Sequence, residues 1–225
     1  MARATLVELL ERNRAHVDAI SDDHFDDVVD GQLPSVVSLC CADSRVSQEG
    51  MWNVEHPGWL FTPSNIGNVA WDDDDPTAVD GNLLYPVAHT ETRTITVIGH
   101  TGCGAVTAAY RAVTDDEWPD WPSIRRRVEP LVPVVEAALD GPVDDGDEVV
   151  NQLVEYNVGE QVAFLHASDE IPDDTSVFGF VYDLHGVYGG KRGRVYLVAA
   201  DGETGPETLE KWVNEENESA VRSLL

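Results

Sequence analysis

Two cysteines and a histidine have the side chains and the spacing to bind one metal ion. His100 and Cys103 stand in the order H-x-x-C within the loop GHTGCGA (99–105), and Cys41 lies in an earlier apolar segment. Two thiolates and an imidazole suit zinc, and three protein ligands leave the fourth tetrahedral position for water or substrate. The glycines of the loop allow the backbone to fold both side chains back toward a single ion. The H-x-x-C spacing alone is equally compatible with a buried cysteine beside a core histidine.

A carboxylate and a guanidinium follow Cys41 closely, in the run CADSR (41–45). Arginine pairs with carboxylates through two parallel hydrogen bonds, and side chains next to metal ligands orient what the metal binds. Asp43 and Arg45 thus lie two and four residues after the first candidate metal ligand. A purely structural zinc site, such as that of a non-catalytic assembly subunit, needs neither residue.

Buried strands are predicted immediately before both parts of this constellation. The segments PSVVSLCCA (34–42) and TITVIG (94–99) are short apolar runs bounded by polar loops, which is typical of strands in the core of a sheet. The carboxyl ends of such strands meet at the ligand-binding crevice of an open α/β sheet. Cys41 and the loop that contains His100 and Cys103 would converge there.

The remaining pattern predicts an α/β fold with a mainly parallel central sheet, one antiparallel edge strand, flanking helices and an N-terminal helical arm. Helices are expected at residues 1–20, 82–90, 104–113, 123–139, 149–168 and 204–225, and further strands at 59–62, 176–183 and 193–201. A short glycine-rich segment joins the last two strands and favours a hairpin. No linker or internal repeat divides the sequence, so we expect residues 1–225 to form a single domain.

Acidic residues dominate the composition, with 42 aspartates and glutamates against 14 lysines and arginines and a formal net charge of −28. This excess argues against nucleic acid as a partner, because phosphate binding requires a positive surface. The acidic residues are spread along the whole chain and lysine is scarce, a composition that resembles proteins of salt-accumulating halophiles. Molar salt shortens the screening length to about 3 Å and would relieve the self-repulsion. An ordinary acidic cytosolic protein is the alternative interpretation.

The sequence also gives expectations about location. Its apolar runs are shorter than the roughly 20 residues that a membrane-spanning helix requires, so we expect no membrane partner. Three cysteines, two of them adjacent, make a poor disulfide framework and fit a reducing interior. We therefore expect a cytoplasmic protein.

The loop at 99–105 has one rival interpretation, a phosphate cradle for a dinucleotide. Its glycines, at positions 99, 102 and 104, do not satisfy G-x-G-x-x-G. No acidic residue ends a convincing second strand about 20 positions later, as ribose recognition would require. This alternative predicts bound nucleotide and no zinc.

Taken together, C-x-D-S-R followed by H-x-x-C-G resembles the β-class carbonic anhydrases. Other segments resemble the same family: PGWLF (57–61), NIGN (65–68), TITVIGHTGCGAV (94–106) and VYDLHGVYGGKRGRVYLV (181–198). The resemblance implies that one Zn²⁺ per chain is bound by Cys41, His100 and Cys103, and that Asp43 and Arg45 form the catalytic dyad. It implies reversible hydration of carbon dioxide to bicarbonate and a proton by zinc-bound hydroxide. Hydrolysis of carbon disulfide or carbonyl sulfide, by enzymes with the same ligand set, is the alternative.

The resemblance also assigns a substrate pocket. Phe61, Ile66 and Tyr85 match apolar positions beside carbon dioxide. Gln32 matches a glutamine that hydrogen-bonds substrate, and Gly104 matches a backbone amide that can meet it. Gln32 could equally be a solvated turn residue, and the three apolar side chains could be ordinary core. The family further implies a homodimer or homotetramer with the active site near the subunit interface.

Two departures from the family pattern concern regulation. Many members have arginine before the NIxN motif, where this chain has Ser64. Members with an inhibitory bicarbonate pocket combine that arginine with a tryptophan at the position of Ser38. We infer that this pocket is absent and that Asp43 is not readily drawn onto the metal at neutral pH. Two thiolates also cancel the charge of zinc, so activity should rise toward alkaline pH.

Overall fold

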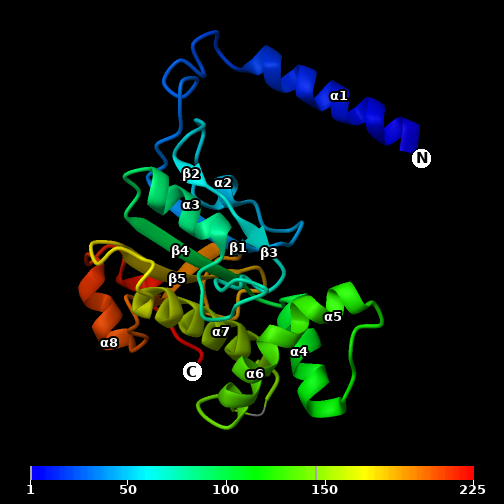
Figure 1. Cartoon of the computed structure of the whole chain (residues 1–225), viewed down its shortest axis with the longest axis vertical. Helices are drawn as coiled ribbons and strands as arrows, with labels where there is room; N and C mark the ends of the chain where they lie inside the picture. Colours follow the sequence, from blue (N-terminus) through cyan, green and yellow to red (C-terminus); the bar gives the residue numbers. More distant parts are fainter. Residues whose placement is uncertain (1, 145) are drawn as a thin grey trace.

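The computed structural model describes residues 2–144 and 146–225, with a sheet at its centre (Figure 1). The strand order is β2-β1-β4-β5-β6, and β3 also pairs with β1. All paired strands are parallel except β5 and β6. The strands are β1 (Val36–Cys41), β2 (Leu60–Phe61), β3 (Ser64–Asn65), β4 (Thr94–His100), β5 (Ser176–Asp183) and β6 (Arg194–Ala200). The structure confirms the predicted α/β fold with a mainly parallel sheet and one antiparallel edge strand.

The two central strands have sequences typical of strands covered on both faces. β1 (VVSLCC) and β4 (TITVIGH) are buried along nearly their whole length. β5 instead alternates between buried and half-buried residues. Its half-buried side carries Phe178 and Phe180, which pack against an apolar cluster of β6 and the C-terminal segment. The ring of Phe180 also lies 5.2 Å from that of Trp52, so the half-buried face of β5 is partly covered.

Helix α7 (Val149–Ala167) packs on β4, β5 and β6 (Figure 1). Two glycines allow its close approach. A Cβ at Gly99 would come 2.8 Å from Val158, and a Cβ at Gly179 would come 2.6 Å from the same residue. A larger side chain at either glycine would push the helix off the sheet. The helix is therefore a closely fitted support for the central strands.

Helix α3 (Gly81–His89) contacts β1, whereas α4 (Gly104–Asp115), α5 (Pro122–Val128) and α6 (Val132–Leu139) pack on one another and, through α4 and α6, on α7. The sequence predicts one helix over 123–139, whereas the structure has α5 and α6 separated by a 3₁₀ turn at Glu129–Leu131. Pro130 and Pro133 explain the break, because proline lacks the N–H of the helical hydrogen bond. The short helix α2 (Gln48–Met51) was not expected, and it begins after Ser47, whose Oγ accepts the N–H of Gly50.

The prediction of a C-terminal helix over residues 204–225 is wrong. The segment forms only α8 (Pro206–Leu209) and two 3₁₀ turns, Glu210–Trp212 and Glu218–Ala220. Asn214 is one reason, because its side chain accepts hydrogen bonds from the backbone and side-chain amides of Asn217 and so favours a turn. Tertiary contact is the other, because Val221 pairs with Leu197 of the edge strand β6 and is buried there.

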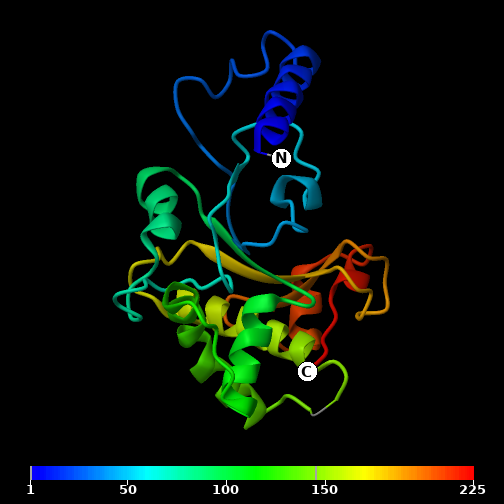
Figure 2. The same cartoon turned by 90° about the vertical axis from the view of Figure 1, so that its right-hand side faces the viewer.

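Helix α1 (Ala2–Ala19) projects away from the rest of the chain and is the predicted N-terminal arm (Figure 1, Figure 2). Met1, the first residue of the expected helix 1–20, and Asp145 lie outside the described residues. The apolar side chains of the arm are uncovered, and Leu6, Leu9 and Leu10 are 57–60% exposed. Among the helices of residues 2–144 and 146–225, none has the length and apolar character needed to cross a membrane.

Candidate metal centre

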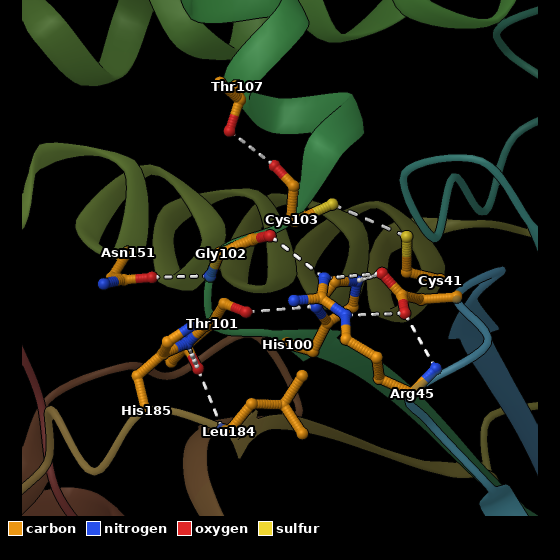
Figure 3. Close-up of polar contacts among 11 residues, drawn as sticks. Cys41, Arg45, His100, Thr101, Gly102, Cys103, Thr107, Asn151, Leu184 and His185 are labelled. Carbon is orange, nitrogen blue, oxygen red and sulfur yellow. Dashed lines mark hydrogen bonds and ion pairs between the residues drawn. The ribbon is translucent and has the colours of Figure 1, made fainter.

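Three buried side chains converge where β1 and β4 end (Figure 3). Cys41 is the last residue of β1, His100 is the last of β4, and Cys103 precedes α4. The two strands are parallel neighbours, so their carboxyl ends lie side by side. The ligand atoms of the three residues lie within 4.8 Å of one another, and the two sulfur atoms are 3.5 Å apart. The structure brings together the three residues that the sequence singled out as metal ligands.

The His100 ring is oriented for a ligand that the chain itself does not supply. Its Nδ1 atom lies 3.2 Å from the carbonyl oxygen of Thr101, which fits an Nδ1–H that donates to this carbonyl. The Nε2 atom is buried and has no hydrogen-bond partner among the described residues. An unpaired buried polar atom is costly. A metal ion bound by Nε2 and the two sulfur atoms would satisfy it, and this set of ligands suits zinc.

The two thiols affect each other's ionisation. The hydrogen bond from Cys41, together with the nearby His100 ring, lowers the pKa of Cys103 to about 4. The same hydrogen bond and burial raise the pKa of Cys41. Burial opposes protonation of His100, but the Cys103 sulfur beside the ring raises its pKa overall. Protons held on Cys41 and His100 would have to leave when a metal binds, so metal affinity should fall at acid pH.

Asp43 and Arg45 form a bidentate ion pair beside His100. Arg45 donates from Nε to Oδ1 of Asp43 at 2.9 Å and from Nη2 to Oδ2 at 2.7 Å, and its backbone N–H donates to Oδ1 at 2.9 Å. These donors hold the pKa of Asp43 well below its usual range. Oδ2 of the ionised carboxylate lies 3.5 Å from Nε2 of His100. The carboxylate is therefore next to the position that a metal ion would take.

Two further contacts support the loop between His100 and Cys103. The N–H of Gly102 donates to Oδ1 of Asn151 at 2.8 Å, and the hydroxyl of Thr101 accepts the N–H of Leu184 at 2.9 Å. Neither contact was predicted from the sequence. Asn151 lies in no motif, and the sequence predicts only that it belongs to the long amphipathic helix of residues 149–168.

The residues expected to line a substrate pocket are only partly brought together. The rings of Phe61 on β2 and Tyr85 on α3 have centroids 6.4 Å apart. Phe61 borders a cavity of about 440 Å³ whose lining does not include the three candidate metal ligands. Ile66 and Tyr85 are 36% and 50% exposed. Gln32 lies on the exposed segment before β1, and Gly104 begins α4, where a Cβ would meet no described residue from outside its own stretch of helix within 4 Å.

Similarity to known proteins extends over most of the chain. A family model described as carbonic anhydrase matches residues 36–189. Carbonic anhydrase 2 of Mycobacterium tuberculosis is 34% identical over 147 residues, which are 65% of this chain and 66% of that protein. A carbonic anhydrase of Emericella nidulans is 30% identical over 189 residues, which cover 79% of this chain and 78% of the relative. A Coccomyxa β-carbonic anhydrase in complex with acetazolamide is 28% identical, with a TM-score of 0.71 and coverage of 92% of this chain and 91% of that one.

The chain belongs to the β-class carbonic anhydrase family. The three candidate metal ligands and the Asp43–Arg45 pair of this β-class carbonic anhydrase lie within the matched residues 36–189, whereas α1 and the C-terminal segment lie outside them. The alignment with the mycobacterial relative spans 66% of that protein, just under two thirds of its length. The relatives named here are carbonic anhydrases, so the alternative of a carbon disulfide or carbonyl sulfide hydrolase is not favoured.

Proposed function

We propose that this chain catalyses the reversible hydration of carbon dioxide to bicarbonate and a proton, with one Zn²⁺ held by Cys41, His100 and Cys103. The observation that carries the proposal is the buried Nε2 of His100, which has no hydrogen-bond partner in the described part of the chain and lies within reach of two thiols. The same atom is 3.5 Å from the carboxylate of Asp43. When bound there, zinc would supply the Lewis acidity that ionises a water molecule and yields the hydroxide that attacks carbon dioxide.

Asp43 and Arg45 act as orienting groups in this proposal. Each carboxylate oxygen has two lone pairs, so Oδ2 of Asp43 can accept from Arg45 and from one further donor. We assign the O–H of the reacting water as that donor, which would aim an oxygen lone pair at carbon dioxide. Arg45, through its two side-chain hydrogen bonds, would keep the carboxylate ionised and off the metal.

The substrate pocket is assigned by the resemblance to the family. Phe61, Ile66 and Tyr85 would form an apolar wall for carbon dioxide, a nonpolar molecule that needs few polar contacts. The contact between the Phe61 and Tyr85 rings supports this wall. Gln32 and the backbone N–H of Gly104 would donate to the oxygen atoms of substrate or product. The exposure of Ile66 and Tyr85 agrees with a pocket that a second subunit completes.

A homodimer or homotetramer is part of the same proposal. The uncovered leucines of α1 form an apolar stripe that a second chain would bury. A β-carbonic anhydrase of Sordaria macrospora with the same fold, 23% identical and with a TM-score of 0.70, is described as tetrameric. Both observations support assembly of this chain into a homo-oligomer.

Salt adaptation and a cytoplasmic location complete the proposal. Acidic positions such as residues 22–23 and 73–75 lie exposed, as a solvated acidic surface requires. The three cysteines are buried and free, which fits a reducing compartment. These features support an intracellular protein that works at high salt.

The first test is stopped-flow carbon dioxide hydration in molar salt, from neutral to alkaline pH, with metal content determined on the same sample. We expect about one zinc per chain and an activity that rises with pH, because two thiolates weaken the Lewis acidity of zinc relative to three histidines. Full zinc occupancy without hydration activity would overturn the proposal. Carbonyl sulfide would then be the next substrate to assay.

A further inference from the structure

The backbone of Gly102 is held through both of its peptide units in the metal loop, the segment of residues 99–105. Gly102 lies between two candidate ligands and has a positive φ of 65°. Its N–H donates to Oδ1 of Asn151 at 2.8 Å, and its carbonyl accepts from Nη2 of Arg45 at 3.2 Å (Figure 3). The same Nη2 also donates to Asp43. The conformation of the Gly102 backbone is thus linked to the candidate ligands on either side and, through Arg45, to the Asp43 carboxylate.

Asn151 is itself fixed in place. Its Nδ2 donates to Oε2 of Glu148 at 2.5 Å, so its Oδ1 is the atom that faces Gly102. It belongs to α7, which packs on β4 and β5 through the close contacts at Gly99 and Gly179. Because α7 is packed tightly on the sheet, the position of the Asn151 acceptor does not depend on the metal loop. The hydrogen bond to Gly102 therefore holds the loop at a fixed position relative to the sheet.

In the part of the chain that the structure describes, the Gly102 N–H has one acceptor, and an imidazole lies beside the glycine. A Cβ at Gly102 would lie 2.6 Å from Cε1 of His185, so the imidazole packs directly against the glycine. In the described parts of the chain, Asn151 is the acceptor that the Gly102 N–H reaches. Without it, the N–H would be left unsatisfied or the peptide unit between Thr101 and Gly102 would rotate and draw the Thr101 carbonyl away from Nδ1 of His100.

We infer that Asn151 is a positioning residue of the metal centre, which holds the peptide unit between Thr101 and Gly102 so that His100 and Cys103 keep the separation that metal binding requires. It acts through Gly102 and Arg45 and contacts no reacting group. The inference rests on the proposed metal centre and gives α7 a role beyond packing on the sheet. Loss of the Asn151 acceptor should loosen the metal and leave the chain folded.

The test compares zinc release from the metal-loaded wild type, Asn151→Ala and Gln152→Ala. Gln152 is a matched control on the same helix, because its Oε1 accepts the backbone N–H of Asp144 at 3.0 Å rather than a group of the metal loop. Zinc transfer to an excess of chelator gives the release rate, and thermal unfolding gives the stability. We expect Asn151→Ala to release zinc about 10- to 100-fold faster than the wild type, the range typical of lost support for a metal ligand. Gln152→Ala should release zinc at the wild-type rate.

A rescue variant separates positioning from general stability. Asn151→Asp combined with Glu148→Gln keeps an acceptor for Gly102 and avoids two facing carboxylates, so it should restore slow release. Cobalt-substituted protein adds a spectroscopic readout, because its visible absorption depends on ligand geometry. The absorption should change in Asn151→Ala and return in the rescue variant. The inference is wrong if Asn151→Ala keeps the wild-type release rate and cobalt spectrum, or if Gln152→Ala releases zinc equally fast at the same loss of stability.

The outcomes also distinguish this inference from the proposed function. A wild type that binds zinc but does not hydrate carbon dioxide contradicts the proposed activity, and faster release from Asn151→Ala would still support the positioning role. An active wild type with unchanged release from Asn151→Ala contradicts the positioning role alone. A wild type that binds neither zinc nor cobalt would overturn both.

Discussion

The Asp43 carboxylate accepts three hydrogen bonds from Arg45, one from its backbone and two from its guanidinium. Such a pair fixes the carboxylate without making it a metal ligand. We therefore predict that Asp43→Ala binds zinc normally and loses hydration activity by about 10- to 100-fold. Stopped-flow hydration with metal analysis checks this, and Asp174→Ala, which breaks the exposed ion pair with Arg93, is the matched control. A fully metallated Asp43→Ala with wild-type activity would show that Asp43 does not orient the reacting water.

Cys40 and Cys41 are adjacent on β1, and consecutive strand residues point to opposite faces. Cys41 takes part in the candidate metal centre, whereas Cys40 is 1% exposed and burial raises its pKa to about 12. We predict that Cys40→Ala keeps its zinc and loses about 1 kcal/mol of stability from the buried group removed. Cys41→Ala should lose the metal. Metal analysis after dialysis and urea unfolding check both, and a zinc-free Cys40→Ala would contradict this division of roles.

Ser38 and Ser64 occupy the positions at which a regulatory pocket would need larger side chains. Ser38 is fully buried and its Oγ accepts from Thr96 at 3.1 Å, and Oγ of Ser64 accepts from Gln48 at 3.0 Å. Both hydroxyls are thus engaged within the chain. We predict that crystals of the zinc-loaded protein near neutral pH show Asp43 paired with Arg45 and not bound to the metal. An Asp43 oxygen among the zinc ligands would count against this prediction.

At the scale of the element, Glu155 ties two distant segments to α7. Its buried carboxylate accepts hydrogen bonds from the hydroxyl of Tyr188 at 2.6 Å, the hydroxyl of Ser223 at 2.5 Å and the N–H of Leu224 at 2.9 Å. Tyr188 belongs to the connection between β5 and β6, and the other two donors belong to the C-terminal segment. One side chain of α7 therefore holds the end of the chain in place.

Glu155 also gives the stability of the protein a specific dependence on pH. Burial raises the pKa of Glu155 above its ordinary value of 4.5 in spite of the three donors. The folded protein keeps the proton of the Glu155 carboxyl at pH values where the unfolded chain has lost it. The contribution of Glu155 to the free energy of unfolding is therefore lost as pH rises from about 4.5 through the folded pKa. Glu155→Gln does not ionise. We predict that the free energy of unfolding of the wild type minus that of Glu155→Gln falls across this window and is constant above it.

Urea unfolding at constant salt and several pH values checks the Glu155 prediction. Glu160→Gln, on the exposed side of the same helix, is the matched control. If the free energy of unfolding of the wild type minus that of Glu155→Gln rises or stays flat across the window, burial does not set the pKa of Glu155.

Elements with a strong local pattern could be predicted from the sequence, and the C-terminal segment could not. The apolar runs of β1 and β4 and the amphipathic pattern of α7 are sufficient to define those elements. The path of the C-terminal segment instead depends on the pairing of Val221 with β6 and on hydrogen bonds to Glu155. These contacts join residues far apart in the sequence, and no local pattern reveals them.

The same contrast holds at the metal centre. Cys41, His100 and Cys103 could be placed together because the carboxyl ends of neighbouring parallel strands lie at one edge of a sheet. The role of Asn151 could not be predicted, because this residue lies on α7, far from the metal loop in the sequence, and its amide belongs to no motif. The roles of Gln32, Ile66 and Tyr85 rest on resemblance and stay predictions, because a single chain leaves them exposed.

At the scale of the whole molecule, a formal net charge of −28 implies self-repulsion in dilute buffer. The screening length falls from about 10 Å at 0.1 M salt to about 3 Å at 1 M. We predict that raising potassium chloride from 0.1 M to 1 M raises the unfolding temperature by several degrees. In a chain of this size, each 1 kcal/mol gained in the free energy of unfolding raises that temperature by about 2–4 °C. Thermal unfolding with sucrose at equal osmolality as the control checks this. A single transition would agree with the predicted single domain, and an unfolding temperature that salt does not raise would contradict salt adaptation.

The three candidate metal ligands lie within the first 103 residues, but the groups that support their loop, Asn151 and Leu184, come much later in the chain. A ribosome makes the chain from its N-terminus, so the ligands leave it well before their supports do. During that interval β4 lacks its neighbour β5, and the loop has no helix to close against. We therefore expect metal capture to be a late event in biosynthesis. The cell would deliver zinc to a finished, folded enzyme rather than to a growing one.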